Sequence, residues 1–159
     1  MLDVNTPRGQ TTIQEERDAV ALFTASFPNI MYVDTPKKGS ATVDAVLFRQ
    51  EDGILCGVVE TKCRQMTHSQ LLTYGNEWLV TWDKIDASRR IAESLGVPLY
   101  GFLYLVPDRT LLVRVIADEN GALTQSIRIE ATQTQRTVNG GQVVRNNAYI
   151  NMTNCREIR

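Results

Sequence analysis

Two neighbouring stretches of this sequence are dense in β-branched and aliphatic residues and are separated by a short polar segment. The stretches cover residues 42–49 and 54–63, and the polar segment, 50–53, ends in a glycine. Polar residues and glycine between two apolar runs are typical of a β-hairpin. We therefore predict two antiparallel strands here. Most of what the sequence indicates about fold and function depends on this hairpin.

Three charged residues interrupt the apolar hairpin. Asp44 lies within the first strand, and Glu60 and Lys62 lie near the end of the second. Since alternate residues of a strand share a face, Glu60 and Lys62 point the same way. A turn at 50–53 brings Asp44 level with Glu60 on the neighbouring strand. Burying an unpaired charge is costly, so these groups must be exposed, neutralise one another, or hold a cation and an anion.

The two carboxylates suggest a metal site. Carboxylates that share a site repel each other unless a cation lies between them, and Mg²⁺ prefers carboxylate, carbonyl and water oxygens. Asp44, Glu60 and the carbonyl of Thr61 are therefore candidate ligands for Mg²⁺ or Mn²⁺. Lys62 can then stabilise an attacking hydroxide or the extra charge of a pentavalent phosphorus. This combination suits the hydrolysis of a phosphodiester bond.

A helix is predicted over residues 12–26, ahead of the hairpin. Its first residues, Thr12-Ile13-Gln14-Glu15, fit a capping box, and a proline follows its end. At about 100° per residue, Glu16 falls on the apolar stripe of this helix. We expect Glu16 to point at the sheet, where it can hold a metal-bound water.

The remaining segments predict further strands and helices. They are a strand at 30–33, helices at 67–74 and 83–95, a hairpin formed by 99–106 and 110–116, and a polar hairpin turning at 139–141. This order favours a mixed sheet packed against helices.

Composition is that of one small domain. The chain has 159 residues, of which 43% are hydrophobic, enough for a single core. Its three cysteines contain no C-x-x-C pair, which supports neither a disulfide framework nor a zinc site. The longest apolar run, 99–106, is too short to cross a bilayer, and the first ten residues do not resemble a secretory signal. We expect no membrane association and a cytoplasmic location.

Candidate phosphate contacts come from local basic residues. The net charge is −1, so attraction to nucleic acid has to arise from a patch rather than from the whole molecule. Lys37 and Lys38 form a basic loop before the hairpin, Arg64 follows its second strand, and Arg136 and Arg145 flank the predicted polar turn. Exposed arginines also occur as plain solvated surface charges, so these assignments are hypotheses.

Taken in order, these residues resemble the PD-(D/E)xK nuclease superfamily, and within it the RecB-like branch. The resemblance covers about residues 12–106 and consists of a helical acid, a strand aspartate, an E-x-K triplet and a helical Q-x-x-x-Y motif. Its elements are Glu16, Asp44, Glu60-Thr61-Lys62 and Gln70-Leu71-Leu72-Thr73-Tyr74. Thr42-Val43-Asp44 departs from the family pattern, because it lacks the proline that names the superfamily.

The resemblance implies the roles of the site residues. Asp44, Glu60 and the Thr61 carbonyl would be metal ligands, and Lys62 the catalytic lysine. Glu16 would be an auxiliary ligand. Gln70 and Tyr74 would lie behind or beside the scissile phosphate.

The resemblance also implies an overall fold and an activity. It implies an α/β, restriction-endonuclease-like mixed central sheet flanked by helices. The whole chain, 1–159, would be a single nuclease domain, with a catalytic core at about 12–106 and a C-terminal β extension at about 107–159. We expect Mg²⁺- or Mn²⁺-dependent hydrolysis of DNA in replication, recombination or repair, in a protein encoded by a phage or mobile element. A homodimer is one assembly that would let so small a nuclease enclose a duplex.

Other interpretations of the same residues stay open. Asp44, Glu60 and Lys62 can form a structural ion-pair network at a sheet end. Gln70 and Tyr74 can simply hydrogen-bond and pack. The chain can be a restriction-type or structure-selective endonuclease of the same superfamily, or an inactive nuclease-like domain that binds nucleic acid or a protein. Cleavage of DNA discriminates the enzymes from the binding domain.

Overall fold

The computed structural model describes residues 6–36, 41–124, 127–136 and 142–159, which form a mixed α/β fold. Its main sheet has the strand order β1-β2-β3-β5-β6-β9. The strands of this sheet are β1 (Ile30–Asp34), β2 (Ala45–Arg49), β3 (Leu55–Arg64), β5 (Leu99–Leu105), β6 (Thr110–Ala117) and β9 (Arg156–Ile158). Only the pair β3 and β5 is parallel among these described strands, so the sheet is mixed but mostly antiparallel.

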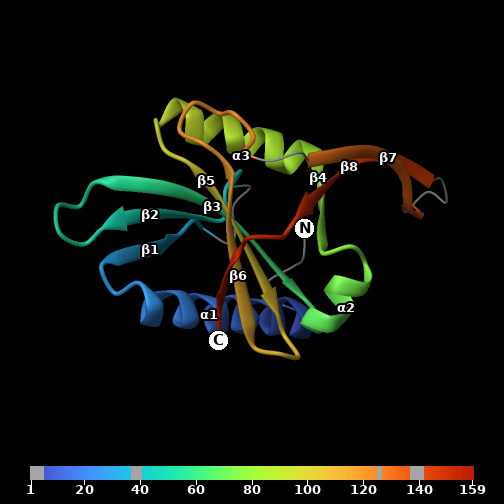
Figure 1. Cartoon of the computed structure of the whole chain (residues 1–159), viewed down its shortest axis with the longest axis horizontal. Helices are drawn as coiled ribbons and strands as arrows, with labels where there is room; N and C mark the ends of the chain where they lie inside the picture. The colour runs from blue at the N-terminus through green and yellow to red at the C-terminus, as the bar shows by residue number, and fades with distance from the viewer. Residues whose placement is uncertain (1–5, 37–40, 125–126, 137–141) are drawn as a thin grey trace.

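Helices cover both faces of the main sheet. Helix α1 (Pro7–Ser26) lies along one face and α3 (Trp82–Ser94) along the other (Figure 1). Because side chains alternate along β3, Val59 packs beneath α1 with Phe23, whereas Val58 belongs to the core that also contains Ile85 of α3. The expected mixed sheet packed against helices is confirmed.

The predicted hairpin register is confirmed. Ala45 pairs with Val59 and Leu47 with Gly57, so the next position places Asp44 level with Glu60. The backbone N–H of Asp44 donates to the Val59 carbonyl at 3.1 Å. Strand β2 begins at Ala45 rather than at residue 42, so Asp44 lies directly before the strand and not within it.

The first helix begins earlier than expected. Its N-cap is Thr6, whose side chain accepts from the Gly9 N–H at 3.0 Å, and Pro7 is its first residue. A proline suits this position because its nitrogen has no hydrogen to leave unpaired. The capping box predicted at residues 12–15 is therefore wrong. Thr12 lies inside the helix and donates to the Arg8 carbonyl.

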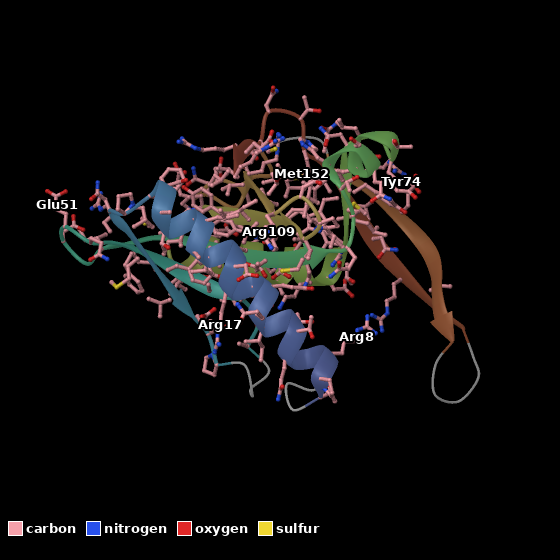
Figure 2. The ribbon with its side chains drawn as sticks, turned by 90° about the horizontal axis from the view of Figure 1, so that it is seen from below. Arg8, Arg17, Glu51, Tyr74, Arg109 and Met152 are labelled. Atoms are coloured by element: carbon pink, nitrogen blue, oxygen red, sulfur yellow. The ribbon has the colours of Figure 1, made fainter. Side chains whose placement is uncertain are left out.

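A second sheet was not expected. It has the order β4-β8-β7, with β4 (Glu77–Thr81), β8 (Gln142–Asn151) and β7 (Ile127–Arg136) all antiparallel. The strands β7 and β8 project beyond the main sheet (Figure 2). Strands β6 and β9, which also belong to the predicted C-terminal extension, pair instead within the main sheet. The residues after 107 thus do not form one separate extension.

The short helix α2 (His68–Thr73) connects β3 to the second sheet. It lies where the sequence predicts a helix at 67–74, and α3 and the β5–β6 hairpin also match their predictions closely. The polar turn at 139–141 lies outside the described residues, but the strands on either side of it do pair. No helix in the described ranges is long and apolar enough to cross a bilayer.

Candidate active site

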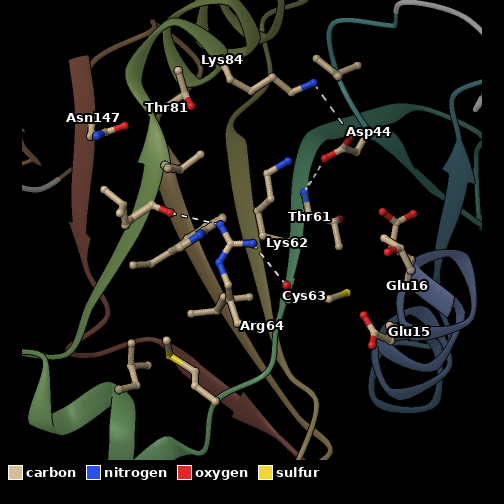
Figure 3. Close-up of a pocket in the computed structure, with 18 of the residues that line it drawn as sticks. Glu15, Glu16, Asp44, Thr61, Lys62, Cys63, Arg64, Thr81, Lys84 and Asn147 are labelled. Atoms are coloured by element: carbon tan, nitrogen blue, oxygen red, sulfur yellow. Dashed lines mark hydrogen bonds and ion pairs between the residues drawn. The ribbon is translucent and has the colours of Figure 1, made fainter. Parts of the chain in front are cut away.

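A cleft of about 1150 Å³ opens beside the end of β3, between α1 and the second sheet (Figure 3). Charged side chains of both signs line it. They are Arg8, Glu15, Glu16, Asp44, Lys62, Arg64, Glu77, Lys84 and Arg128. Cations and carboxylates that meet in one cleft suit a phosphate-containing ligand held together with a metal ion.

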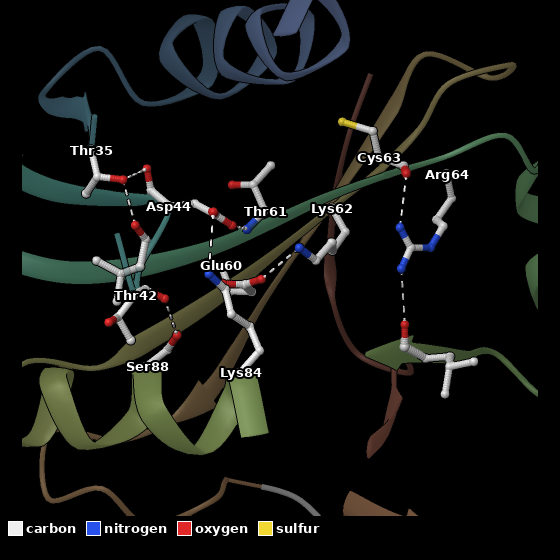
Figure 4. Close-up of polar contacts among 12 residues, drawn as sticks. Thr35, Thr42, Asp44, Glu60, Thr61, Lys62, Cys63, Arg64, Lys84 and Ser88 are labelled. Carbon is white, nitrogen blue, oxygen red and sulfur yellow. Dashed lines mark hydrogen bonds and ion pairs between the residues drawn. The ribbon is translucent and has the colours of Figure 1, made fainter. Parts of the chain in front are cut away.

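Asp44 is anchored to the strand that carries the E-x-K triplet. Its Oδ2 accepts a hydrogen bond of 2.8 Å from the backbone N–H of Thr61 (Figure 4). The neighbouring backbone is fixed as well, because the Thr35 hydroxyl donates to the Asp44 carbonyl at 2.9 Å. These contacts hold the carboxylate beside β3 although Asp44 itself lies before β2.

Glu60 and Lys62 point to the same face of β3, as predicted. Lys62 Nζ lies 3.1 Å from Glu60 Oε1. The Glu60 side chain is fully buried and does not line the cleft, whereas Lys62 is about one-third exposed and does. The carboxylate therefore lies beneath the cleft wall and the lysine faces into the cleft.

Lys84 is a site residue that the sequence analysis missed. It lies in the first turn of α3, and its Nζ is 4.0 Å from Asp44 Oδ1 and 3.7 Å from Glu60 Oε2. One ammonium thus contacts both carboxylates. No local pattern in the sequence links residue 84 to residues 44 and 60; only the expected packing of the 83–95 helix on the sheet could have suggested the contact.

Burial raises the pKa of Glu60 to about 7. Loss of solvation is the largest cause, and the nearby Asp44 carboxylate raises the pKa further, while the Lys62 and Lys84 ammonium groups lower it. Both Glu60 oxygens lack a hydrogen-bond partner with good geometry in the described structure. Their charge is instead balanced by the two lysines at ion-pair distance.

Glu16 lines the same cleft but approaches from the opposite face of the sheet. Burial is the main cause that raises the pKa of Tyr32 and of Cys63, and the nearby Glu16 charge raises both further; both residues belong to the α1 side. Thr61 also points to that side, where its hydroxyl lies 3.2 Å from the Tyr32 hydroxyl. Glu16 thus faces the sheet, as predicted, but it lies on the opposite side of the sheet from Glu60 and Lys62.

The Q-x-x-x-Y residues lie at α2, with Gln70 in its first turn and Tyr74 as its C-cap. The Gln70 side chain accepts from the Thr67 N–H at 2.8 Å and completes a capping box at the start of α2. Gln70 does not line the cleft, and this capping contact accounts for its position without a substrate. Tyr74 lines the cleft and is 69% exposed, so its ring is open to a ligand (Figure 2).

The predicted phosphate contacts fall into three groups. Lys37 and Lys38 lie outside the described residues. Arg64 lines the cleft, but its guanidinium donates to the carbonyls of Cys63 and Leu79, so it joins β3 to β4.

Arg145 and Arg136 lie on the strands of the second sheet. Arg145 is exposed on β8 and pairs with Thr132 of β7. Arg136 ends β7, and only its backbone is described. Arg145 does not line the cleft, so any contact that it makes with nucleic acid lies on the projecting strands rather than beside the carboxylates.

Asp44, Glu60 and the Thr61 backbone fit a hard divalent cation. Glu60 is a buried carboxylate without a well-formed hydrogen bond, and it faces the Asp44 carboxylate across the Lys84 ammonium. Positive charge is required between two such groups. In the described part of the chain, no three His, Cys, Asp or Glu side chains lie close enough together to hold a metal. Carbonyl and water oxygens would therefore complete the ligand set.

Comparison with known proteins adds no relative. No family model, no curated protein and no solved structure matches this chain. The function is therefore inferred from the site itself, from the carboxylate pair and its two lysines.

Proposed function

We propose that this protein is a metal-dependent nuclease that hydrolyses phosphodiester bonds in DNA, with the restriction-endonuclease-like fold that its motifs imply. One observation carries the proposal: the carboxylates of Asp44 and Glu60 face a single position for positive charge, with Lys62 beside it on the cleft wall. The mixed sheet with a helix on each face and the ordered motifs of residues 12–106 agree with it.

Asp44, Glu60 and the Thr61 carbonyl would hold the ion. A bound Mg²⁺ or Mn²⁺ supplies Lewis acidity and a water of lowered pKa. Lys62, which is partly exposed in the cleft, orients a phosphate oxygen and stabilises the charge that develops on it. Tyr74 provides an exposed ring at the cleft for the substrate, and Gln70 supports the helix that carries it.

The proposal is tested by DNA cleavage. Supercoiled, linear, single-stranded and branched DNA are incubated with the protein in Mg²⁺, Mn²⁺, Ca²⁺ or EDTA, beside Asp44→Ala and Lys62→Ala. We expect cleavage in Mg²⁺ or Mn²⁺, none in EDTA, and none by either variant although both keep the wild-type circular dichroism spectrum. Arg90→Ala, on the exposed side of α3, is the control and should cut normally. Wild-type activity in either site variant would rule out this site.

One observation favours a second candidate function. Lys62 and Lys84 already neutralise Glu60, which is also how a structural ion-pair network at a sheet end would look. The chain would then be an inactive nuclease-like domain that binds nucleic acid or a protein partner. Binding of DNA without cleavage under every metal condition would favour this alternative. A homodimer able to enclose a duplex is part of the nuclease proposal, and sedimentation with and without DNA tests it.

A further inference from the structure

We propose that the Lys84 ammonium is a built-in cation that occupies the position between Asp44 and Glu60 and has to be displaced when a divalent ion binds there. The inference rests on the proposed function, because it concerns the same carboxylates. It adds a control on metal binding: the protein carries its own competitor for the metal site.

The position of Lys84 carries the argument. Its Nζ lies 4.0 Å from Asp44 Oδ1 and 3.7 Å from Glu60 Oε2, and in the described structure it is the ammonium that contacts both carboxylates. Lys62, by contrast, forms an ion pair with Glu60. A divalent ion that used both carboxylates would lie where Lys84 now balances their charge, and like charges this close repel strongly.

The local chemistry of α3 does not favour a lysine at this place. Lys84 is in the first turn of the helix, next to the positive end of the helix dipole, where a cation is unfavourable. The carboxylates of Asp44 and Glu60 offset that cost. The placement of Lys84 is therefore explained by the site and not by helix formation.

The backbone that carries Lys84 is held in place. The next residue, Ile85, is completely buried in the core, and one turn later the Ser88 hydroxyl donates to the Thr42 carbonyl at 3.3 Å (Figure 4). This hydrogen bond joins α3 to the segment just before Asp44. Displacement thus requires only a movement of the flexible lysine side chain, while the helix stays where it is.

The cleft gives the displaced side chain somewhere to go. Lys84 is 30% exposed and lines the cleft together with Lys62. Once a metal balances the carboxylates, the Lys84 ammonium can turn into the cleft, where an anionic substrate has to approach. Loading of the metal would then free a second cation to face the phosphate.

The test measures Mn²⁺ binding to the full-length chain, stripped with EDTA and then freed of chelator, at fixed pH and ionic strength. Electron paramagnetic resonance of free Mn²⁺ gives the dissociation constant without relying on activity. Lys84→Met removes the charge and keeps a long side chain, whereas Lys84→Arg keeps the charge. Arg90→Met removes a charge from the exposed side of the same helix, where Arg90 contacts only the nearby Asp86 among the described ion pairs.

We expect Lys84→Met to bind Mn²⁺ about tenfold more tightly than wild type or better, because a positive charge near the ion is gone. Lys84→Arg and Arg90→Met should stay within about twofold, since the former retains the competing charge and the latter is screened by solvent. Without metal, Lys84→Met should have a lower melting temperature than wild type. Addition of Mn²⁺ should raise the melting temperature of Lys84→Met by more than that of wild type.

Two results would overturn the inference in different ways. Unchanged or weaker Mn²⁺ binding by Lys84→Met, with wild-type binding that Asp44→Asn weakens by about tenfold or more, would remove the competitor role and leave the nuclease proposal standing. Absence of Mn²⁺ binding to wild type and to Lys84→Met alike would overturn both.

Discussion

The Asp44 carboxylate accepts a 2.8 Å hydrogen bond from the backbone N–H of Thr61, the central residue of the E-x-K triplet. This bond fixes the acid that precedes β2 to the strand that carries Glu60 and Lys62. Since the bond uses one carboxylate oxygen, the other, Oδ1, is the one that faces Lys84. Asp44 thus has two roles: Oδ2 holds the residue in place through the bond to Thr61, and Oδ1 carries charge toward Lys84.

Asp44→Asn should therefore keep the fold and weaken binding of the metal ion. The amide oxygen can still accept from Thr61, so we expect the free energy of unfolding to change by about 1 kcal/mol or less. Loss of one of two carboxylates should weaken Mn²⁺ binding by about tenfold or more. Asp52→Asn, in the β2–β3 turn, is the matched control and should bind Mn²⁺ as wild type does. Equal binding by both variants would refute the role of Asp44.

Lys62→Met should separate catalysis from metal binding. Its ammonium faces the cleft, where we expect it to stabilise the charge of the transition state. Removing it should lower the rate of DNA cleavage by about 10²- to 10³-fold, a loss typical of a single stabilising donor. Mn²⁺ binding should persist, because both carboxylates remain. A variant that cuts at the wild-type rate would exclude Lys62 as the catalytic lysine.

Glu60 should make the metal-free protein less stable as the pH rises. Its pKa is raised from 4.5 to about 7 by burial, so between these values the folded chain holds a proton that the unfolded chain has released. Stability then falls with rising pH, by up to about 3 kcal/mol from this group once the pH exceeds 7. Urea unfolding in EDTA at pH 5 and pH 8 measures the effect.

Glu60→Gln is the comparison for this pH effect. The amide does not ionise, so the variant should lose less stability than wild type between pH 5 and pH 8. Parallel changes in the two proteins would show that the Glu60 carboxyl does not titrate in this range.

Gly101→Ala should destabilise the strand next to the E-x-K triplet. Gly101 pairs with Glu60 across β3 and β5, and a Cβ there would lie 2.6 Å from the Trp78 ring and 2.7 Å from Ile116. Both neighbours are buried, so we expect a loss of about 1–3 kcal/mol in urea unfolding.

Gly57→Ala is the matched comparison for Gly101→Ala. Its Cβ would meet mainly the ring of Tyr100, which is only partly buried and can shift. Gly57→Ala should therefore lower the free energy of unfolding by less than Gly101→Ala does. A Gly101→Ala protein as stable as wild type would contradict the packing around β5.

The hairpin and its register could be predicted from the sequence because they depend on local signals. A polar turn fixes which residues of two apolar strands pair, and alternation then fixes which of them share a face. The pairing of Ala45 with Val59 and the common face of Glu60 and Lys62 follow from these two rules. The helix from 83 and the β5–β6 hairpin were predictable for the same reason.

The start of α1 and the second sheet show where local signals are insufficient. The sequence predicts a cap at 12–15, but α1 is capped at Thr6, whose side chain accepts from the Gly9 N–H. Strand β4 is short and is stabilised by pairing with β8, about seventy residues later in the chain. Its pairing partner could not be read from the residues around it.

By itself, the sequence determined the central hairpin and the alignment of Asp44 with Glu60, because periodicity and turns act over a few residues. Only the tertiary structure decided that Lys84 contacts both carboxylates, that Glu16 approaches from the other face, and that Arg64 donates to backbone carbonyls. These contacts depend on how α1, α3 and the second sheet pack on the main sheet. Packing brings together residues that no short-range pattern connects.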